Sequence, residues 1–212
     1  VGESRQVGPL TGNVTEDFAL DVDLDPCVAP GYTPGVVGPF SDDFESGLTN
    51  WTLSGLWNAE GEGDTCGSLV APFPSPTNAA YYGQDGVCTY DTGSPNTGSL
   101  AMASAVTVPA GADLLFQSFE ETECGGNCGY DNRYVDISTN GGGTWTNLGE
   151  GDTGGAWNGY RFDLSAYAGS SAQLRFRFDS VDSFANSYFG WMVDNAQIGT
   201  LVCNPPANGG LV

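Results

Sequence analysis

The chain has 212 residues, of which 26 are acidic and 5 are arginine; it contains no lysine or histidine, and its formal net charge is −21. Such a surface repels nucleic-acid backbones and anionic membranes, so we expect no nucleic-acid partner and no membrane insertion. The absence of histidine excludes Ser-His-Asp triads, Cys-His pairs and histidine-based zinc sites. No apolar run approaches the ~20 residues that span a bilayer.

The first 39 residues are interpreted as an N-terminal extended arm followed by a linker. Residues 17–24 alternate between large apolar side chains and small or acidic ones, which is a strand pattern. The apolar members of this strand are Phe18, Leu20, Val22 and Leu24. Such a strand cannot bury its apolar face alone, so we expect it to add to a sheet edge of its own molecule or of a neighbouring copy. A linker rich in Pro and Gly follows, from Pro26 to Pro39.

Residues 40–200 are predicted to form one all-β domain, and residues 201–212 an extended tail. Strands are expected around 40–45, 51–57, 99–108 and 114–120, with long loops over 58–100, and further short strands follow between 130 and 198. These strands are short, and Gly, Asn and Ser turns separate many of them. This pattern favours an antiparallel β-sandwich over a parallel α/β sheet.

The strand at 174–178 shows the alternation most clearly. Its apolar residues Leu174, Phe176 and Phe178 share one face, which we expect to point into the core. Arg175 and Arg177 lie on the opposite face, where we expect them to pair with some of the many acidic residues. On the strand before the Gly-rich turn, Val135 and Ile137 likewise share one face, and Tyr134, Asp136 and Ser138 lie on the other.

Six cysteines are present, at Cys27, Cys66, Cys88, Cys124, Cys128 and Cys203. An even number in a turn-rich chain without histidine favours disulfides and an oxidising, extracellular compartment. Six cysteines allow 15 pairings, which their order alone does not resolve. The preferred set is Cys66–Cys88, Cys124–Cys128 and Cys27–Cys203. Val1 is not an initiator methionine and no signal segment is present, so we expect a processed or excised product.

The sequence STNGGGTW, from Ser138 to Trp145, fits the Asp-box hairpin pattern with Asn140 in place of the aspartate. Asparagine supports such a turn because its side chain bonds to the backbone nearby and because it tolerates positive φ. Asp-boxes occur in sialidases, where they lie away from the catalytic pocket, and they recur in noncatalytic proteins. We therefore expect a structural role for this turn.

Five pieces of the chain, in order, carry a family resemblance. They are FSDDFESGLTNWTLSGLW, VDISTNGGGTWTNL, FDLSAYAG, LRFRFDS and GWMVDNAQI, and they span roughly 40–199. In these pieces the chain resembles the jelly-roll modules of secreted immune-inhibitor-type metallopeptidases and of anchored bacterial surface proteins, and more distantly MAM domains. The resemblance implies a jelly-roll fold with an accessory, adhesive or structural role.

The resemblance also implies that the first and last strands of the module lie side by side. Asp43, Glu45 and Asp194 would then meet at one rim, where like charges repel unless a cation or a proton neutralises them. Calcium accepts six to eight oxygen ligands, so a structural calcium ion is predicted there, and a solvated acidic rim is the alternative. Asp131 and Glu121, which flank the CGGNC loop, form a second-tier candidate group.

Several aromatic residues lie in expected loops or at strand ends and are candidates for stacking on a sugar. The preferred candidates are Trp57, Tyr81, Tyr82 and Trp157, and Tyr160 and Tyr188 belong to the same group. Exposed rings of this kind bind the apolar faces of sugars. The alternative is that such rings fill the core, which we expect for Trp51, Trp145 and Trp191.

The sequence thus predicts a noncatalytic extracellular β-sandwich. Two functions compete. In the first, the chain is a structural subunit that self-associates through its arm on a cell surface or in an extracellular filament. In the second, it is an adhesin module that binds a carbohydrate or a cell-surface protein and was released from a larger secreted protein. A glycosidase needs two carboxylates roughly 5 to 9 Å apart, a distance that no sequence gives.

Overall fold

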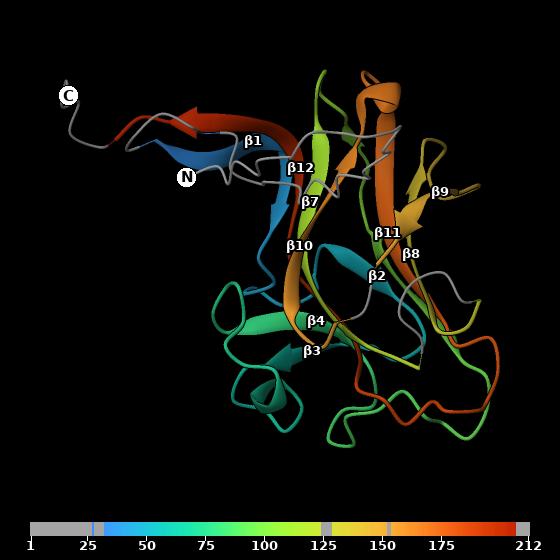
Figure 1. The fold of residues 1–212 in the computed structure, drawn as a ribbon. Coiled ribbons are helices and arrows are strands. Elements are labelled where there is room, and N and C mark those ends of the chain that lie inside the picture. The colour runs from blue at the N-terminus through green and yellow to red at the C-terminus, as the bar shows by residue number, and fades with distance from the viewer. Residues whose placement is uncertain (1–26, 28–31, 124–128, 152–153, 207–212) are drawn as a thin grey trace, which may run out of the picture.

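The computed structural model describes Cys27 and residues 32–123, 129–151 and 154–206. In this part of the chain, two antiparallel sheets of six strands each pack face to face (Figure 1). This arrangement confirms the predicted all-β sandwich of jelly-roll type. The predicted arm strand at residues 17–24 and the predicted Cys124–Cys128 bond lie outside the described residues. No described helix is long and apolar enough to cross a membrane.

The first sheet has the strand order β10-β7-β12-β4-β3, and β1 pairs with β12. Its strands are β1 (Thr33–Asp42), β3 (Trp57–Gly61), β4 (Asn78–Tyr82), β7 (Asp113–Glu121), β10 (Trp157–Asp163) and β12 (Gly190–Asn204). The pair β3 and β4 lies within a stretch that the sequence predicts as long loops.

The second sheet has the order β2-β5-β11-β8-β9, and β6 pairs with β11. Its strands are β2 (Trp51–Leu53), β5 (Thr97–Met102), β6 (Val106–Thr107), β8 (Asn132–Ser138), β9 (Thr146–Glu150) and β11 (Ser171–Asp179). Two single-turn 3₁₀ helices complete the described elements, η1 (Gly67–Leu69) and η2 (Ser165–Tyr167).

The core between the sheets follows the predicted alternation. Val135, Ile137 and Phe176 are buried, and Phe176 meets Trp191 edge to face with ring centroids 5.7 Å apart. Burying each side chain of this size contributes about 1.5–3 kcal/mol. Trp51 is also buried, as expected.

The outer face of the second sheet carries the two arginines, as predicted. Both Arg175 and Arg177 donate to the buried carboxylate of Asp136. The prediction that Trp145 lies in the core is wrong: it is half-buried on the outer face, and the guanidinium of Arg175 lies 4.3 Å from its ring. The Asp-box turn forms as predicted, since the Oδ1 of Asn140 accepts the Thr144 N–H at 2.9 Å.

β1 and β12 continue past the sandwich as a two-stranded ribbon, which projects sideways in Figure 1. The pairing of β1 with β12 begins at Thr33 and Asn204. Residues 33–39 of the predicted linker and residues 201–204 of the predicted tail therefore belong to strands. The prediction of a loose linker fails because Pro is tolerated in an edge strand and Gly permits close backbone approach. A Cβ at Gly38 would lie 1.9 Å from the Ile198 carbonyl oxygen.

A second, smaller apolar cluster lies outside the first sheet and is called here the outer cluster. It consists of Cys66, Val70, Phe73, Ala79, Tyr81, Phe119, Phe189 and Met192. The loop that carries η1 folds over β4 and β12 to form it, and the predicted Cys66–Cys88 disulfide fastens this loop with a Cα–Cα distance of 5.1 Å. The predicted Cys27–Cys203 bond is also present, with a Cα–Cα distance of 5.4 Å.

Candidate functional site

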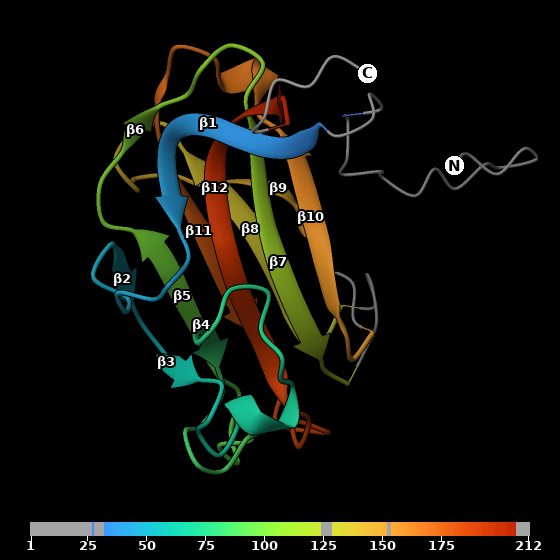
Figure 2. The same ribbon diagram turned by 90° about the vertical axis from the view of Figure 1, so that its left-hand side faces the viewer.

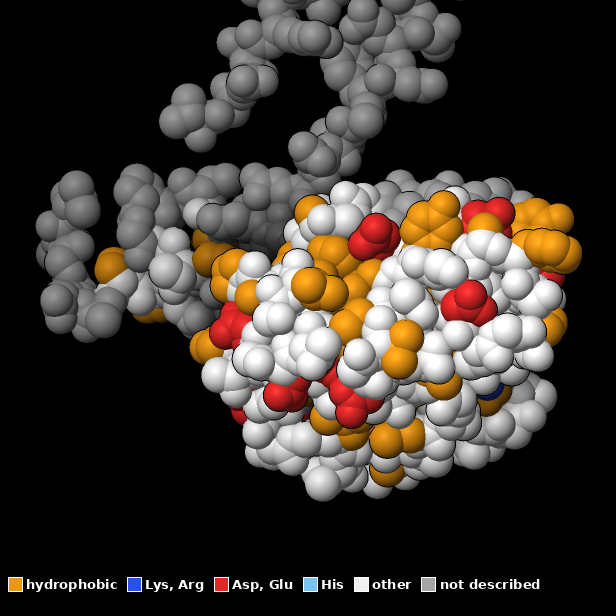
Figure 3. Space-filling model, turned by 90° about the horizontal axis from the view of Figure 1, so that it is seen from below, with side chains coloured by type: hydrophobic (Ala, Val, Ile, Leu, Met, Phe, Trp, Pro, Cys, Tyr) orange, Lys and Arg blue, Asp and Glu red, His pale blue; other side chains and the backbone are white. Residues whose placement is uncertain are grey.

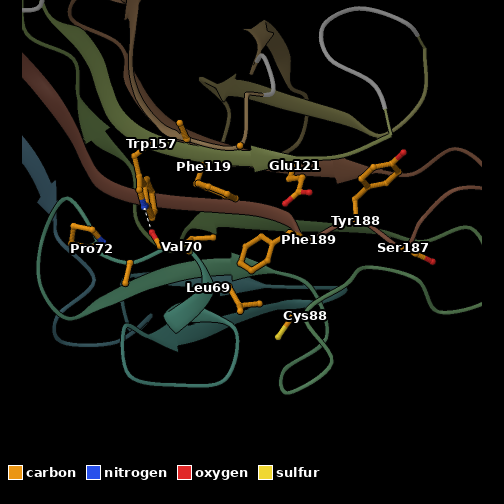
Figure 4. Close-up of a pocket in the computed structure, with 13 residues that line it drawn as sticks. Leu69, Val70, Pro72, Cys88, Phe119, Glu121, Trp157, Ser187, Tyr188 and Phe189 are labelled. Carbon is orange, nitrogen blue, oxygen red and sulfur yellow. Dashed lines mark hydrogen bonds between the residues drawn. The ribbon is translucent and has the colours of Figure 1, made fainter.

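A hollow of about 620 Å³ lies on the outer face of the first sheet, beside η1 and the outer cluster. We call it the Trp157 pocket. Its main lining side chains are Leu69, Phe119, Glu121, Trp157, Tyr188 and Phe189. Figure 4 shows Trp157 and Tyr188 on opposite sides, with Phe119 and Phe189 between them. The pocket therefore has two aromatic walls and an aromatic floor.

The strand register explains why these side chains share one face. Along β7, Leu114 and Phe116 belong to the main core, so Phe119 and Glu121 point to the opposite face. Trp157 on β10 pairs directly with Phe119, and their ring centroids are 6.0 Å apart. The alternation of β7 and the pairing of β10 are thus sufficient to build one wall of the pocket.

Trp157 is held firmly although part of its surface is open. Its Nε1–H donates to the carbonyl of Val70 at 3.0 Å, and its ring meets Phe73 edge to face at 5.7 Å. The side chain is half-buried. A ring fixed in this way loses little conformational entropy when a ligand stacks on it, because its rotamer is already chosen.

The segment that leads into Trp157 is anchored to the end of β7. The amides of Gly154 and Gly155 donate to the carbonyl of Glu120 at 3.3 and 3.1 Å. The side chain of Glu120 points the other way, into the sandwich, where it pairs with the buried Arg133 at 2.8 Å. We did not predict this ion pair, because sequence order alone does not indicate that Arg133 faces the interior.

The aromatic rings share the open lining of the Trp157 pocket with a larger polar surface. Glu121 is exposed at its rim, and the Oγ of Ser187 lies 3.1 Å from a carboxylate oxygen of Asp91. Tyr188 is 38 % exposed, and Leu69 nearby is 67 % exposed. Figure 3 views the molecule from this end and shows apolar side chains interspersed with acidic ones. The site thus combines apolar walls with a carboxylate and hydroxyl groups.

Three of the four aromatic residues predicted to stack on a ligand are in fact buried. Trp57 is 5 % exposed, and Tyr81 and Tyr82 are fully buried. These predictions are wrong because β3 and β4 are strands of the first sheet and both of its faces are covered there: Trp57 and Tyr82 pack in the main core, and Tyr81 packs in the outer cluster. Trp157 keeps open surface and lines a pocket. Tyr188, a further member of the predicted aromatic group, lines the same pocket, as does Phe189, which no sequence pattern distinguishes.

Of the three acids predicted to meet at one rim, Asp194 and Glu45 bond through their carboxylates to the loop at residues 75–78, whereas Asp43 contributes its backbone carbonyl. The hydroxyl of Ser75 donates to Oδ1 of Asp194 at 2.7 Å and to the carbonyl of Asp43 at 3.0 Å. Glu45 reaches the same loop, because its Oε1 accepts the Asn78 N–H at 2.7 Å. Burial raises the pKa of Asp194 to about 6, and the nearby charge of Glu45 contributes to the rise.

Carboxylate oxygens at this rim, which would be the ligands of a calcium ion, already have hydrogen-bond donors. Both carboxylate oxygens of Asp194 and of Glu45 already accept hydrogen bonds from the loop at Ser75, Thr77 and Asn78. Among the described residues, no three Asp, Glu, Cys or His side chains are grouped so that they could hold a metal ion. The rim as described is therefore stabilised by hydrogen bonds, and calcium stays a prediction.

The second-tier pair does not form a shared site in the described structure. Asp131 is fully buried, and its Oδ2 accepts hydrogen bonds from the hydroxyl of Tyr90 at 2.5 Å and the amide of Glu123 at 3.0 Å. Burial raises the pKa of its carboxyl group. Glu121, by contrast, is exposed at the Trp157 pocket. The two were paired because they flank the CGGNC loop, but Glu121 ends β7 on the outer face of the first sheet, whereas Asp131 is buried beside Tyr90.

Comparisons with known proteins identify the fold. No protein-family model matches the sequence, and no curated protein matches it. The K1 cleaved adhesin domain of Lys-gingipain from Porphyromonas gingivalis W83 is a similar solved structure, with a TM-score of 0.53 and 19% identity. The match covers 77% of this chain and 99% of the adhesin domain.

Two Paenibacillus barcinonensis modules are also similar. The CBM22-1 xylan-binding domain has a TM-score of 0.45 and 16% identity, over 78% of this chain and 96% of that one. A CBM35 has a TM-score of 0.43 and 12% identity, over 76% and 99%. The predicted resemblance to MAM domains and metallopeptidase modules is matched by no family model. What is shown is the fold: a jelly-roll β-sandwich similar to that of an adhesin domain.

Proposed function

We propose that this chain is a noncatalytic, extracellular binding module that holds a glycan in the Trp157 pocket. The observation that carries the proposal is the fixed, half-exposed ring of Trp157 opposite Tyr188. Ligand pockets commonly combine apolar walls with polar groups and have volumes of roughly 300–1,000 Å³, a range that includes this pocket. Aromatic rings bury the apolar faces of sugars, while carboxylate and hydroxyl groups bind the sugar hydroxyls.

The charge of the protein restricts the class of glycan. Glu121 is exposed at the rim of the pocket, and the whole chain carries a formal charge of −21. Anionic sugars such as uronates would approach against this field. The ligand that fits is therefore an uncharged glycan. A protein on a cell surface is the alternative ligand of a module with this fold.

The proposal is tested by measuring binding to uncharged polysaccharides, including xylan and β-1,4-galactan, with the anionic polygalacturonate as comparison. Trp157→Ala should reduce binding of an uncharged member about five- to a hundredfold, if a sugar ring gains on the order of the 1–3 kcal/mol that a nucleic-acid base gains by stacking on an aromatic side chain. Trp145→Ala is the matched control, since Trp145 is a half-buried tryptophan on the opposite sheet. Binding to none of the panel, or equal losses in both variants, would refute the proposal.

An extracellular location is part of the proposal. Its support is the pair of disulfides, Cys27–Cys203 and Cys66–Cys88, because disulfides persist in oxidising compartments. A structural calcium ion at the rim of Asp43, Glu45 and Asp194 is proposed as well. Its support is that the carboxylates of Asp194 and Glu45 both bond to the loop at residues 75–78, where bound calcium would supply charge neutralisation.

Self-association through the N-terminal arm is a second candidate function. The ribbon of β1 and β12 favours it, because the ribbon projects from the sandwich and Val37 on it is 65 % exposed. Pairing of β12 with β7 ends at Gly199, so residues 200–204 have described partners only in β1. Such an edge is a template for an added strand.

A further inference from the structure

A second hollow of about 370 Å³ lies on the same outer face of the first sheet, beneath the ribbon. We call it the ribbon pocket. Pro34, Val36 and Leu201 line it from the ribbon, and Leu115 and Gln117 line it from β7. Figure 2 shows β1 crossing the upper parts of β12 and β7. The ribbon therefore roofs one end of the face whose other end holds the Trp157 pocket.

Three side-chain amides line the ribbon pocket, from Gln117, Asn195 and Gln197. All three are half-buried. Within the described residues none of these amide groups makes a hydrogen bond, whereas the amide of Asn58 makes two and that of Asn96 makes three. Each amide offers two N–H donors and a carbonyl acceptor. The pocket thus holds unused hydrogen-bonding capacity in a partly apolar setting.

The two pockets are adjacent along β7. Gln117 in the ribbon pocket lies two residues from Phe119 in the Trp157 pocket, a separation of about 6.6 Å along the strand. On the neighbouring strand, Trp157 pairs with Phe119 and Gly159 pairs with Gln117. Gly159 is exposed and has no side chain, so β10 leaves this row open, and the loop at Val70 and Phe73 borders it through its contacts with Trp157.

The backbone of this face is already paired. β7 lies between β10 and β12 and forms an antiparallel ladder with each. A peptide strand that crosses the face would find no free backbone edge on β7 to pair with. A ligand on this face must be held by side chains, which favours a polyhydroxylated chain over an added strand.

We infer that the Trp157 pocket and the ribbon pocket are two subsites of one groove, which binds an extended, uncharged polysaccharide along β7. Trp157 and Tyr188 contact sugar rings at one subsite, and the amides of Gln117, Asn195 and Gln197 bind hydroxyls at the other. This inference rests on the proposed glycan-binding function and adds to it the ligand's shape and the second subsite. It gives a role to three amides on one face that have no hydrogen-bond partner among the residues that the structure describes.

The test compares short and long oligosaccharides cut from the polysaccharide that the wild-type chain binds. Gln117→Ala and Gln197→Ala should each weaken binding of a long oligomer about three- to tenfold, as the loss of one or two hydrogen bonds implies. Binding of a disaccharide should not change, while Trp157→Ala should weaken both. Gln173→Ala is the control, because Gln173 is a half-buried glutamine on β11 of the other sheet.

Each outcome bears on the inference separately from the proposed function. Equal losses for short and long oligomers, or no loss in folded Gln117→Ala and Gln197→Ala, would overturn the second subsite while Trp157 still binds glycan. If no oligomer binds the wild type, both the function and the inference fail. If the variants change the sedimentation coefficient and leave glycan binding intact, the ribbon pocket receives a second copy and the inference is also overturned.

Discussion

The Nε of Arg133 lies 2.8 Å from an oxygen of Glu120, and both side chains are 1% exposed. The same guanidinium donates to Oγ1 of Thr122 at 2.7 Å and to the carbonyl of Gly151 at 3.1 Å. Two charges buried this deeply are tolerated because each neutralises the other and the remaining N–H groups find acceptors. The pair also fixes the strand end and the loop that frame the Trp157 pocket.

Arg133→Met should lower the free energy of unfolding by about 3–5 kcal/mol, because it leaves the Glu120 carboxylate buried without a counter-charge. The double variant Arg133→Met with Glu120→Gln should be less destabilised than the single one. Urea unfolding followed by tryptophan fluorescence measures both. If the double variant's loss of unfolding free energy equals the sum of the losses in the two single variants, the two residues are not coupled.

Glu60 makes stability depend on pH. Burial raises the pKa of its carboxyl group, and the charges of Asp85 and Asp64 add to the rise. The folded protein therefore holds this proton more tightly than the unfolded chain does. Its contribution to stability is present at low pH and is lost as pH rises from the ordinary glutamate range through the raised pKa.

Glu60→Gln should remove this dependence, because glutamine keeps one carbonyl oxygen as acceptor for the amides of Cys66 and Gly67 and does not titrate. The difference in unfolding free energy, wild type minus variant, should fall as pH rises through that window. Guanidinium unfolding at several pH values measures it. A difference that stays constant, or that rises with pH, contradicts the assignment.

Reduction should destabilise the fold. The Cys66–Cys88 bond closes a loop of 22 residues, for which the chain-entropy model gives about 3 kcal/mol. Cys88 also lines the Trp157 pocket, so paired Cys66→Ala and Cys88→Ala changes should weaken glycan binding as well as lower Tm. If Cys124 and Cys128 pair as predicted, full reduction adds six hydrogens to the intact mass. Free thiols in the native protein would contradict the three-bond prediction.

The predicted calcium ion at the acidic rim is open to a direct test. Chelation should lower Tm and added calcium should restore it, because the ion would neutralise carboxylates that are crowded at the loop. Asp194→Asn should weaken this response. Glu121→Gln should leave it intact, because Glu121 lies at the Trp157 pocket and not at the acidic rim. Metal analysis that finds no calcium, with Tm indifferent to chelator, would leave a hydrogen-bonded rim.

Deleting residues 1–24 tests the assembly function. If the arm adds to the ribbon of a neighbouring copy, the shortened chain should remain folded and become monomeric, because the added strand is then lost. A companion variant changes Phe18 and Leu20 to Asp, which keeps the length of the chain and removes two of the four apolar side chains of the predicted strand. Analytical ultracentrifugation reads the result. An oligomeric state that neither change alters would refute assembly through the arm.

Alternation of apolar and polar residues was sufficient to predict the sandwich and the faces of its long central strands. Leu174, Phe176 and Phe178 are buried and the two arginines between them point outward because a strand has a side-chain period of two. The same rule does not say how many faces of a sheet are covered. Tyr81 and Tyr82 are adjacent in sequence, and both are buried because the η1 loop covers the outer face of β4.

The candidate site was only partly predictable for the same reason. Trp157 was among the residues singled out, but its partners Phe119, Tyr188 and Phe189 come from distant parts of the chain. Local pattern assigns each residue to a face, whereas a pocket depends on which strands become neighbours and on where loops fold back. The ribbon was missed because Pro and Gly near residue 35 are typical of a linker, although the backbone there pairs with β12.

The disulfide between Cys27 and Cys203 has a mechanical consequence. It joins positions that are 176 residues apart, and the entire described sandwich lies within the loop that it closes. A pulling force applied through the chain before Cys27 and after Cys203 would travel across this covalent bond and would not load the strands between. While the bond is intact, the domain is therefore shielded from tension. Reduction would transfer that load to the ribbon, whose β1–β12 hydrogen bonds would then separate first.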